Sequence, residues 1–600
     1  MVQKIFLWIL PIFFYINVFS QTLQQEIQNR FQLAQQFEQI RNFEQAIQIY
    51  ETLLATDSTN TLFIDGLHRC YLQLKKYPLA IQLLQKQLQR SPKDVALLAR
   101  LGETYFLSGN SFVADSLWQK ALTSSSQNQN VYRIIANVQY QNRLFDKAIQ
   151  TYLQGRKTLN NPTLFSKELA GLYSVMMDYN SATQEYILLL LQDERQLEFI
   201  KTRIAFYTSK NEGLVSALSV TEKKLSETNN STLRRLLLWL LIEGKNYEQA
   251  FEVAKKLEEQ THSSGYEIFN FAQQVTNTVA LQAYEYLLKI ETHPSLKPLA
   301  KFGYAKCSEE INANNDTSQI PYQKIITMYR SVAEEYPNTE IALQSKYRTA
   351  IIFSQNLADY DVALQIIDSL LLLPKAKQIF SSLLSTKSEI YLMKGNINEA
   401  EKTFSQLLQI PSLGNQERNE ARLQLAQIQY YKGNFDSASV LLQTLVQDLR
   451  SDEANDALQL QSFIEQYKTS SRQELQVYAK AELCIKQKKY TEAVGMLDEI
   501  EKEFPNSVLL EFVFLKKGEI FSLLRQYQNA ITHYQKLLEV YPKGIVCEQA
   551  LFRIGKIYQN NIKNTAKSIE VYEQFLSQYP QSILTDEVRK QVRILRGDVL

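Results

Sequence analysis

Five alanines recur at intervals of 34 residues in the first third of the 600-residue chain. They are Ala46, Ala80, Ala114, Ala148 and Ala182. The residue four positions after each alanine is large, in order Tyr50, Leu84, Trp118, Tyr152 and Tyr186. A spacing of four places two side chains on one face of a helix. A period of this length indicates a stack of short units, each of which buries its apolar face only against its neighbours.

A second set of positions in the same period lies upstream of the alanines, as with Leu101, Gly102 and Tyr105 in one unit. Small residues in both helices let two backbones cross closely, and the large side chains fill the flanking space. The combined pattern, L-G-x2-Y followed by A-x3-F, resembles the tetratricopeptide repeat (TPR). The resemblance implies an antiparallel helix pair, here called helices A and B, in every unit.

The same pattern continues along the chain with looser spacing. Ala250 lies two periods after Ala182, with a degenerate unit around Ser216 and Ala217 between them. Further starts of helix B are expected at Ala283, Ile325, Ala363, Ala400, Ala438, Ala493, Ala530 and Ser568. The predicted fold is therefore all-α, a right-handed α-solenoid of about fifteen TPR-like units in one superhelix or two.

Composition supports helices and excludes some functions. The chain has only 17 Gly and 13 Pro, so few residues interrupt long helical stretches. Its net charge is +2, with basic and acidic residues interleaved, which argues against a nucleic-acid-binding surface. The four cysteines are far apart and form no metal-ligand spacing, so structural packing is the expected role of each. They are Cys70, Cys307, Cys484 and Cys547.

The N-terminus has the pattern of a signal peptide. Lys4 precedes an almost wholly apolar run from Ile5 to Phe19, and cleavage is expected after Ser20. An uncleaved anchor is the alternative, although this run is shorter than the roughly 20 residues that span a bilayer. The Ser-Gln junction resembles signal peptides of Bacteroidetes. The resemblance implies export to the periplasm or cell envelope.

Changes in pattern divide the rest of the chain into segments. A polar stretch, NANNDTSQ, is expected to form a hinge, and residues 451–473 contain an amphipathic helix that matches neither half of a TPR. A polar helix after Pro580 suits an end cap. The predicted organisation is 1–20 signal peptide, 21–311 N-terminal TPR array, 312–319 polar loop, 320–450 central TPR-like units, 451–473 helical insertion, 474–580 C-terminal TPR units and 581–600 capping helix.

An aromatic-proline pair recurs between units of the second half. It occurs in EEYPNTE (334–340), KEFPNSV (502–508), EVYPKGI (539–545) and SQYPQSI (577–583). Such a pair ends one helix and fixes the entry to the next. Over roughly residues 320–600 these segments resemble the TPRs of periplasmic lipoproteins that assemble the outer membrane. The resemblance concerns fold and compartment.

The sequence contains no motif for catalysis. HExxH, GxSxG, Walker and dinucleotide-binding glycine patterns are absent, so we expect no enzyme activity, cofactor or metal. His68 occupies a helix A position that is small in neighbouring units, and a partly buried structural histidine is favoured over a ligand or pH-sensing role. Cys484 falls in a position that other units fill with core tyrosines, so it is expected to be core.

One helix A column suggests a recognition surface. Fifteen residues before the helix B alanine, four successive units carry Arg133, Lys167, Lys201 and Arg235. In TPR families this column faces the groove where ligand peptides lie, so a basic ladder there would attract an acidic segment or a C-terminal carboxylate. Arg133 with Asn137 resembles half of a TPR carboxylate clamp, but Glu168 stands where the next unit would need Asn. A coincidence among solvated basic residues is the alternative.

The leading functional hypothesis is a non-catalytic scaffold of the bacterial cell envelope that binds protein or peptide partners in a TPR groove. The expected partners exclude nucleic acids and small-molecule substrates, and membrane association is expected only through partners. One alternative is a polysaccharide- or peptidoglycan-binding module, which would need exposed aromatic residues in the groove. Another is a regulatory subunit of an envelope enzyme complex, which would need a domain outside the repeats.

Overall fold

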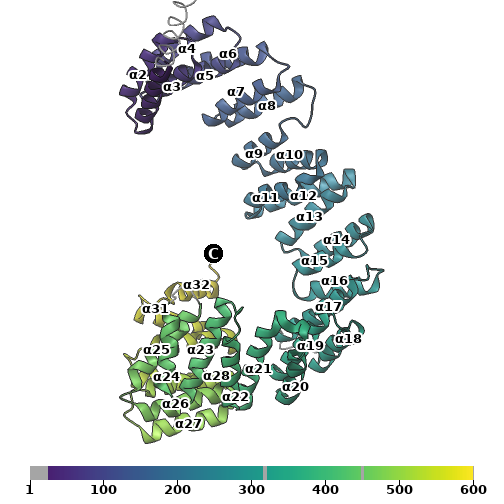
Figure 1. The fold of residues 1–600 in the computed structure, drawn as a ribbon, viewed down its shortest axis with the longest axis vertical. Coiled ribbons are helices and arrows are strands. Elements are labelled where there is room, and N and C mark those ends of the chain that lie inside the picture. Colours follow the sequence, from purple (N-terminus) through teal and green to yellow (C-terminus); the bar gives the residue numbers. More distant parts are fainter. Residues whose placement is uncertain (1–23, 315–319, 448–451, 599–600) are drawn as a thin grey trace, which may run out of the picture. The chain divides into compact units, whose positions relative to one another are not determined.

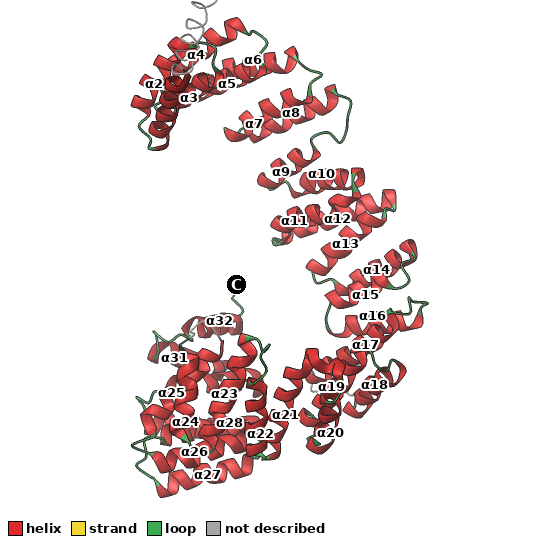
Figure 2. Ribbon diagram, in the orientation of Figure 1, coloured by secondary structure: helices red, strands yellow, loops and turns green. Residues whose placement is uncertain are grey.

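The computed structural model describes residues 24–314, 320–447 and 452–598. Every regular element in these ranges is a helix, and neither a strand nor a helix long and apolar enough to cross a membrane is found there (Figures 1 and 2). The expected signal peptide at 1–20 and most of the polar segment 312–319 lie outside the described residues. The all-α helical-repeat fold predicted from the 34-residue period is confirmed.

The chain divides into two compact units, Met1–Ala283 and Tyr284–Leu600, which are described separately. The boundary falls inside α16 (Asn277–Lys289), the helix B that follows α15 (Tyr266–Gln274). We expected the array to divide at the polar segment 312–319, which lies later in the chain. The other A–B pairs of the first unit are 24–39 with α2 (Phe43–Thr56), α3 (Thr61–Gln73) with α4 (Tyr77–Arg90), α5 (Val95–Leu107) with α6 (Ser111–Ser124), α7 (Gln129–Gln141) with α8 (Phe145–Thr158), α9 (Ser166–Val175) with α10 (Tyr179–Gln192), α11 (Leu197–Thr208) with α12 (Asn211–Thr228), and α13 (Ser231–Glu243) with α14 (Tyr247–Thr261).

The second unit continues the pairing and contains two unpaired helices. Its A–B pairs are α17 (Leu296–Asn314) with α18 (Tyr322–Glu335), α19 (Glu340–Gln355) with α20 (Tyr360–Leu371), α21 (Phe380–Lys394) with α22 (Ile397–Leu408), α23 (Asn415–Tyr431) with α24 (Phe435–Val446), α26 (Arg472–Lys486) with α27 (Tyr490–Glu503), α28 (Leu510–Leu523) with α29 (Tyr527–Val540), and α30 (Cys547–Lys556) with α31 (Thr565–Gln578). α25 (Asp452–Tyr467) lies within the expected insertion, and α32 (Thr585–Arg596) within the expected cap. The described residues thus hold fifteen pairs, in agreement with the repeat count.

The close crossing inside each pair has the predicted form. All five alanines of the 34-residue series are fully buried, and Trp118 is only 1% exposed. An added Cβ at Gly102 of α5 would lie 2.4 Å from the indole nitrogen of Trp118 in α6, so the absence of a side chain at Gly102 makes room for the ring. Gly518 stands in the same relation to Tyr534, and Gly555 to Tyr572. Small residues therefore set the separation of the helices, and aromatic rings fill the space between them.

The turn from helix A to helix B has a fixed register. In twelve units the residue five positions before the helix B alanine, or before Ser568, has a positive φ. Only three of the twelve are glycine, at Gly109, Gly395 and Gly433. In one example the Lys76 N–H donates to the Tyr71 carbonyl across this turn at 2.8 Å. This is the Schellman pattern of helix termination, which satisfies otherwise unpaired carbonyls at the end of helix A.

The aromatic-proline pairs end helix B as predicted. Tyr336, Phe504, Tyr541 and Tyr579 are the C-cap residues of α18, α27, α29 and α31. Each cap N–H donates to the carbonyl four residues earlier. The following proline cannot donate a backbone hydrogen bond and disfavours the helical conformation of the cap residue, whose φ and ψ lie outside the helical region in all four cases, so the helix ends there.

Ion pairs connect each helix A to the next in much of the array. They are Glu38–Arg69, Asp65–Arg100, Arg133–Glu168 and Arg235–Glu267 in the first unit, and Glu309–Arg348, Glu482–Lys516 and Glu519–Arg553 in the second. Partners come from neighbouring repeats, because a side chain in one repeat lies beside the equivalent position of the next. These contacts fix the register of stacking more than they add stability, since partly exposed pairs contribute about 1 kcal/mol or less.

In the second unit the end of α26 makes contacts that skip one and two helix pairs. The Gln487 side chain donates to the Leu392 carbonyl at the end of α21, 95 residues away. Lys488 donates to the Gln355 carbonyl at the end of α19, 133 residues away. Both acceptors lie at helix C-termini, where carbonyls lack partners within the helix. These contacts therefore hold the end of α26 against α21 and α19, although other helix pairs separate them in the chain.

Candidate functional site

A cavity of the first unit lies among α7, α9 and α11, where the sequence predicted part of its recognition surface. Its volume is about 670 Å³, and Asn137 and Lys167 are among its lining residues. Tyr152 of α8 and Tyr186 of α10 form part of its base, both nearly completely buried. The stacking of three successive helices A produces this groove, because their surfaces face the same way at equivalent positions.

Two cations and an aromatic ring form the centre of this groove. The Lys167 ammonium lies 4.9 Å from the centroid of the Phe199 ring, and the Arg203 guanidinium lies 5.2 Å from it. Neither cation has a carboxylate partner among the residues that the structure describes. Cation–π contacts of this kind contribute about 0.5–1 kcal/mol at exposed sites, so both cations can still bind an anion.

Exposed aromatic rings lie beside these cations. Phe206 of α11 is 74% exposed and Tyr140 of α7 is 46% exposed, and both line the cavity. Val175, at the end of α9, is half exposed in the same cavity. An open surface that combines cations with large apolar groups suits a segment carrying an acidic group next to an apolar side chain.

Arg133 is held by its own chain. Its guanidinium Nε donates to Glu168 of α9 at 3.0 Å, and its guanidinium carbon lies 5.5 Å from the Phe165 ring centroid. In the sequence, Glu168 stands where the carboxylate-clamp pattern would need Asn. In the structure it is the ion-pair partner of Arg133, the first residue of that pattern. A ligand carboxylate would have to displace Glu168, so Arg133 positions the wall of the groove.

The remaining members of the predicted ladder are also paired. Lys201 bonds Glu198 within α11 at 2.8 Å, and Arg235 bonds Glu267 of α15 at 2.5 Å. The column does place its residues on successive helices A, as the period requires. Three of the four charges are, however, compensated locally. The anion-binding capacity of the column is therefore concentrated on Lys167, and whether the whole ladder recognises a ligand stays a prediction.

Arg203 is the groove residue that the column did not identify. It lies two residues after Lys201 and four after Phe199, so a search at fixed period missed it. An Arg four residues after an aromatic on a helix A is the signal that could have found it, because side chains at that spacing meet on the helix surface.

The histidine singled out by the sequence is structural. His68 is 4% exposed, and its Nε2 lies 2.9 Å from the Thr104 hydroxyl. Because Thr104 donates its own proton to the Arg100 carbonyl, the His68 Nε2–H must be the donor. Burial, followed by the nearby Arg100 charge, lowers the pKa of His68 to about 4, so the ring is neutral at physiological pH.

The four cysteines are buried, as expected from packing, and free, and burial raises the pKa of Cys484 in the core of the second unit. Across the described ranges, no group of three or more His, Cys, Asp and Glu side chains is arranged to hold a metal ion.

Comparison with known proteins agrees with this architecture. Residues 512–544 and 549–582, which span α28–α29 and α30–α31, match the family profile of the tetratricopeptide repeat. A TPR repeat-containing protein of Methanocaldococcus jannaschii is 21% identical over 395 residues, which cover 61% of this chain and 67% of that protein.

Solved structures also resemble the chain. Naa15/Naa10 bound to HypK-THB is 13% identical, with a TM-score of 0.28, and the match covers 95% of this chain and 96% of that one. A tetratricopeptide repeat protein from Parabacteroides merdae is 13% identical, with a TM-score of 0.26, and the match covers 51% and 97% of the two chains. The profile match shows tetratricopeptide repeats at residues 512–544 and 549–582, and the other helix pairs of the chain have the same antiparallel form. Repeats of this class generally mediate protein–protein interactions.

Proposed function

We propose that the chain is a non-catalytic scaffold whose first unit binds an acidic peptide segment of a partner protein in the groove of α7, α9 and α11. The observation that carries the proposal is a pair of cations, Lys167 and Arg203, that flank Phe199 in a cavity of about 670 Å³ and have no carboxylate partner in the part of the chain that the structure describes. A ligand carboxylate would supply the missing partner. Phe206 and Tyr140 would contact an adjacent apolar side chain.

Charge reversal tests this proposal. In the double variant Lys167→Glu/Arg203→Glu, we expect affinity for acidic partner peptides to fall at least tenfold, because two attractive contacts become repulsive. Binding is measured by fluorescence anisotropy on an array of peptides that pair Asp, Glu or a free C-terminus with an apolar residue. Lys86→Glu/Lys120→Glu changes the same charge on exposed positions of α4 and α6 and should bind normally. Equal affinity of the two double variants would refute the groove as the site.

A glycan-binding function has a specific observation in its favour, the exposed rings of Phe206 and Tyr140 in the same groove. Sugar rings stack on such aromatic faces. The two functions respond differently to substitution. Phe206→Ala would abolish glycan binding, whereas Lys167→Glu would leave it nearly intact. Binding of peptidoglycan fragments with this dependence would favour the glycan module over the peptide scaffold.

The proposed setting is the bacterial cell envelope, after export through the N-terminal apolar segment. The support is the order of Lys4, the apolar run and Ser20 in the sequence. Fusing residues 1–30 to alkaline phosphatase, which is active only where disulfides form, tests export directly. We expect the fusion with the native residues 1–30 to be active in the periplasm. An inactive native fusion beside an active Lys4→Glu fusion would be inconsistent with export through this segment.

A further inference from the structure

The groove of α7, α9 and α11 changes character along its helices. Lys167 is the second residue of α9 and Phe199 the third of α11, and the Lys167 and Arg203 cations both lie against the Phe199 ring. Val175 ends α9, and Phe206 lies near the end of α11. Helices A run in the same direction, because an antiparallel helix B follows each one. The cations therefore lie towards the start of these helices, and exposed apolar side chains lie towards their ends.

The apolar end of the groove exposes more surface than helix packing explains. At the end of α9, Val175, Met176 and Met177 are three exposed apolar residues in succession. Met177 has the left-handed backbone of the turn to helix B, and the other eleven residues at this turn position are Lys, Arg, Gly or Ala. A lysine or arginine there interacts favourably with the last carbonyls of helix A, which methionine cannot do. The exposed methionine thus has no role in ending the helix and suits an adaptable binding surface.

The separation of the two ends limits what a ligand can be. Phe199 and Phe206 are seven residues apart, so they lie on one face of α11 and about 10 Å apart along its axis. Lys167 and Val175 are about 12 Å apart along α9 by the same measure. A ligand that pairs with the cations and covers the apolar end must carry an anionic and an apolar group about 10 Å apart.

Regular backbone conformations place side chains on one side at different intervals. In a polyproline II segment, residues three positions apart face the same way at about 9.3 Å. A β-strand gives about 6.7 Å for two positions or about 13 Å for four. A helix reaches about 10.5 Å with seven positions, but a helix of that length occupies roughly 800–1,200 Å³, more than the cavity of about 670 Å³. Among these conformations, polyproline II alone matches both the distance and the volume.

We infer that the groove binds an extended segment in the polyproline II conformation, in which an acidic residue and an apolar residue are three positions apart. This inference rests on the proposed peptide-binding function and specifies its ligand. The acidic side chain pairs with Lys167 and Arg203, and the apolar side chain lies against Val175 and Phe206. The exposed Tyr140 and Phe206 rings fit such a segment, because polyproline II segments dock in grooves lined by aromatic side chains.

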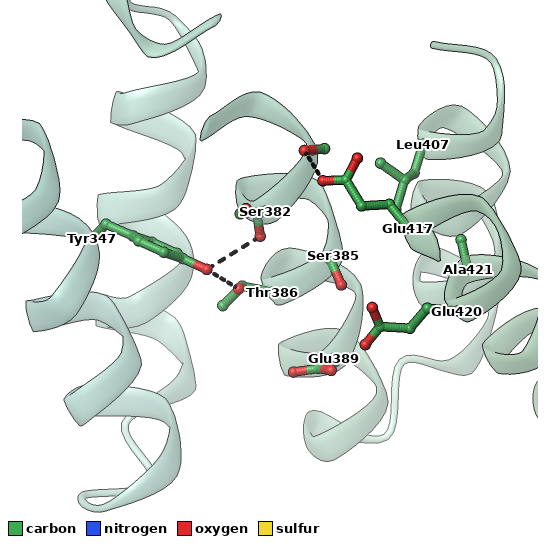
Figure 3. Close-up of a pocket in the computed structure, with 10 residues that line it drawn as sticks. Tyr347, Ser382, Ser385, Thr386, Glu389, Leu407, Glu417, Glu420 and Ala421 are labelled. Atoms are coloured by element: carbon green, nitrogen blue, oxygen red, sulfur yellow. Dashed lines mark hydrogen bonds between the residues drawn. The ribbon is translucent and has the colours of Figure 1, made fainter. Parts of the chain in front are cut away.

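A cavity between helices A of the second unit has the opposite charge. It has a volume of about 200 Å³ and lies among α19, α21, α22 and α23 (Figure 3). Its lining includes the carboxylates of Glu389, Glu417 and Glu420 and no lysine or arginine. An acidic segment would be repelled there. We therefore expect one such segment to bind per chain.

Fluorescence anisotropy on the full chain tests the spacing. The labelled probes are capped peptides with one, two or three prolines between Asp and Leu, which places the two residues two, three or four positions apart. We expect the two-proline peptide to bind about fivefold or more tighter than the other two, because it alone presents both side chains on one side. Glycines in place of its prolines should weaken binding, because the pre-formed conformation is lost. The same series with Leu before Asp covers the opposite chain direction, and the tighter-binding series should have its optimum at two prolines.

Two variants connect the spacing preference to the apolar end. Phe206→Ser should equalise the affinities of the three peptides while each still binds more tightly than its Asn counterpart, because the cations remain. Phe112→Ser, at an exposed position of α6 that does not line the groove, should keep the preference for two prolines.

The outcomes separate this inference from the proposed function. Asp-dependent binding that is equal at the three spacings, or tighter binding of a helical peptide with Asp and Leu seven positions apart, would overturn the polyproline II ligand and leave the acidic-peptide function standing. An unchanged preference in Phe206→Ser would overturn the assignment of the apolar end. Equal affinity for the Asp and Asn peptides would overturn the proposed function itself.

Discussion

Replacing Gly102 by alanine tests the packing rule that builds the array. The new Cβ would lie 2.4 Å from Nε1 and 2.7 Å from Cδ1 of Trp118, closer than any van der Waals contact allows. The indole is 1% exposed and donates to the Ala99 carbonyl at 3.1 Å, so it cannot move without losing that bond. The indole ring that the new methyl group would meet is therefore held in place.

The size of the effect follows from opposing contributions. Overpacking costs about 1–3 kcal/mol, and loss of the indole hydrogen bond costs about 1 kcal/mol more. Alanine gains about 1 kcal/mol over glycine in a helix interior. The net destabilisation is roughly 1–3 kcal/mol, equivalent to about a 5- to 150-fold increase in local opening.

Hydrogen exchange measured by mass spectrometry is the suitable assay, because a repeat array opens locally and does not melt as one unit. In Gly102→Ala, peptides from residues 95–124 should exchange about 5- to 150-fold faster than in the unsubstituted protein. Gly495→Ala is the matched control, since no heavy atom lies within 4 Å of its added Cβ in α27. That variant should exchange more slowly. Similar protection from hydrogen exchange in the two variants would refute the proposed clash with Trp118. Purely additive effects of Gly102→Ala and Trp118→Leu on that protection, measured in the double variant, would also refute it.

Other changes give independent tests. The pKa of His68 is about 4 in the folded protein and 6.5 when the side chain is exposed. The neutral buried ring therefore contributes to the free energy of unfolding above pH 6.5, and this contribution, roughly 3 kcal/mol at most, is lost as the pH falls through 4. His68→Gln should remove this part of the acid sensitivity in thermal melts, while the exposed His262→Gln should not. The buried Lys517 pairs with Asp498 and Glu501, and Lys517→Met should destabilise the second unit by about 2 kcal/mol. This is less than the usual cost of breaking a buried pair, because Lys536 still neutralises Glu501 and Asp498 is largely exposed. A variant as stable as the parent in urea would contradict this. Arg143→Gly, at a left-handed backbone position, should stabilise α7–α8 by about 0.5–1 kcal/mol, and Gly109→Ala should have the opposite sign; hydrogen exchange reports both.

Much of the fold was predictable because the repeat pattern is local. Every alanine of the 34-residue series, from Ala46 to Ala182, is buried at an A–B crossing, and the aromatic-proline pairs end helices as expected. A helix crossing needs small residues at fixed intervals, so the period alone determines where pairs form. The left-handed turn before helix B was not predicted, since nine of its twelve residues are not glycine.

The candidate sites were less predictable, because they depend on which charges meet between repeats. The column of Arg133, Lys167, Lys201 and Arg235 was visible in the sequence, but their partners were not. Glu168 and Glu267 come from neighbouring helices A, and only stacking shows that they neutralise Arg133 and Arg235. Arg203 became part of the groove through its contact with Phe199.

The sequence by itself determined that this chain forms about fifteen antiparallel helix pairs, because spacing within a helix decides which side chains share a face. The tertiary structure decided which charges remain available to a ligand. Among the described residues of the first unit, Lys167 and Arg203 remain without carboxylate partners, whereas Arg133, Lys201 and Arg235 are paired. Helices far apart in the chain, such as α26 and α19, meet only when the repeats stack. Electrostatic compensation depends on distance in space, which a period in sequence does not specify.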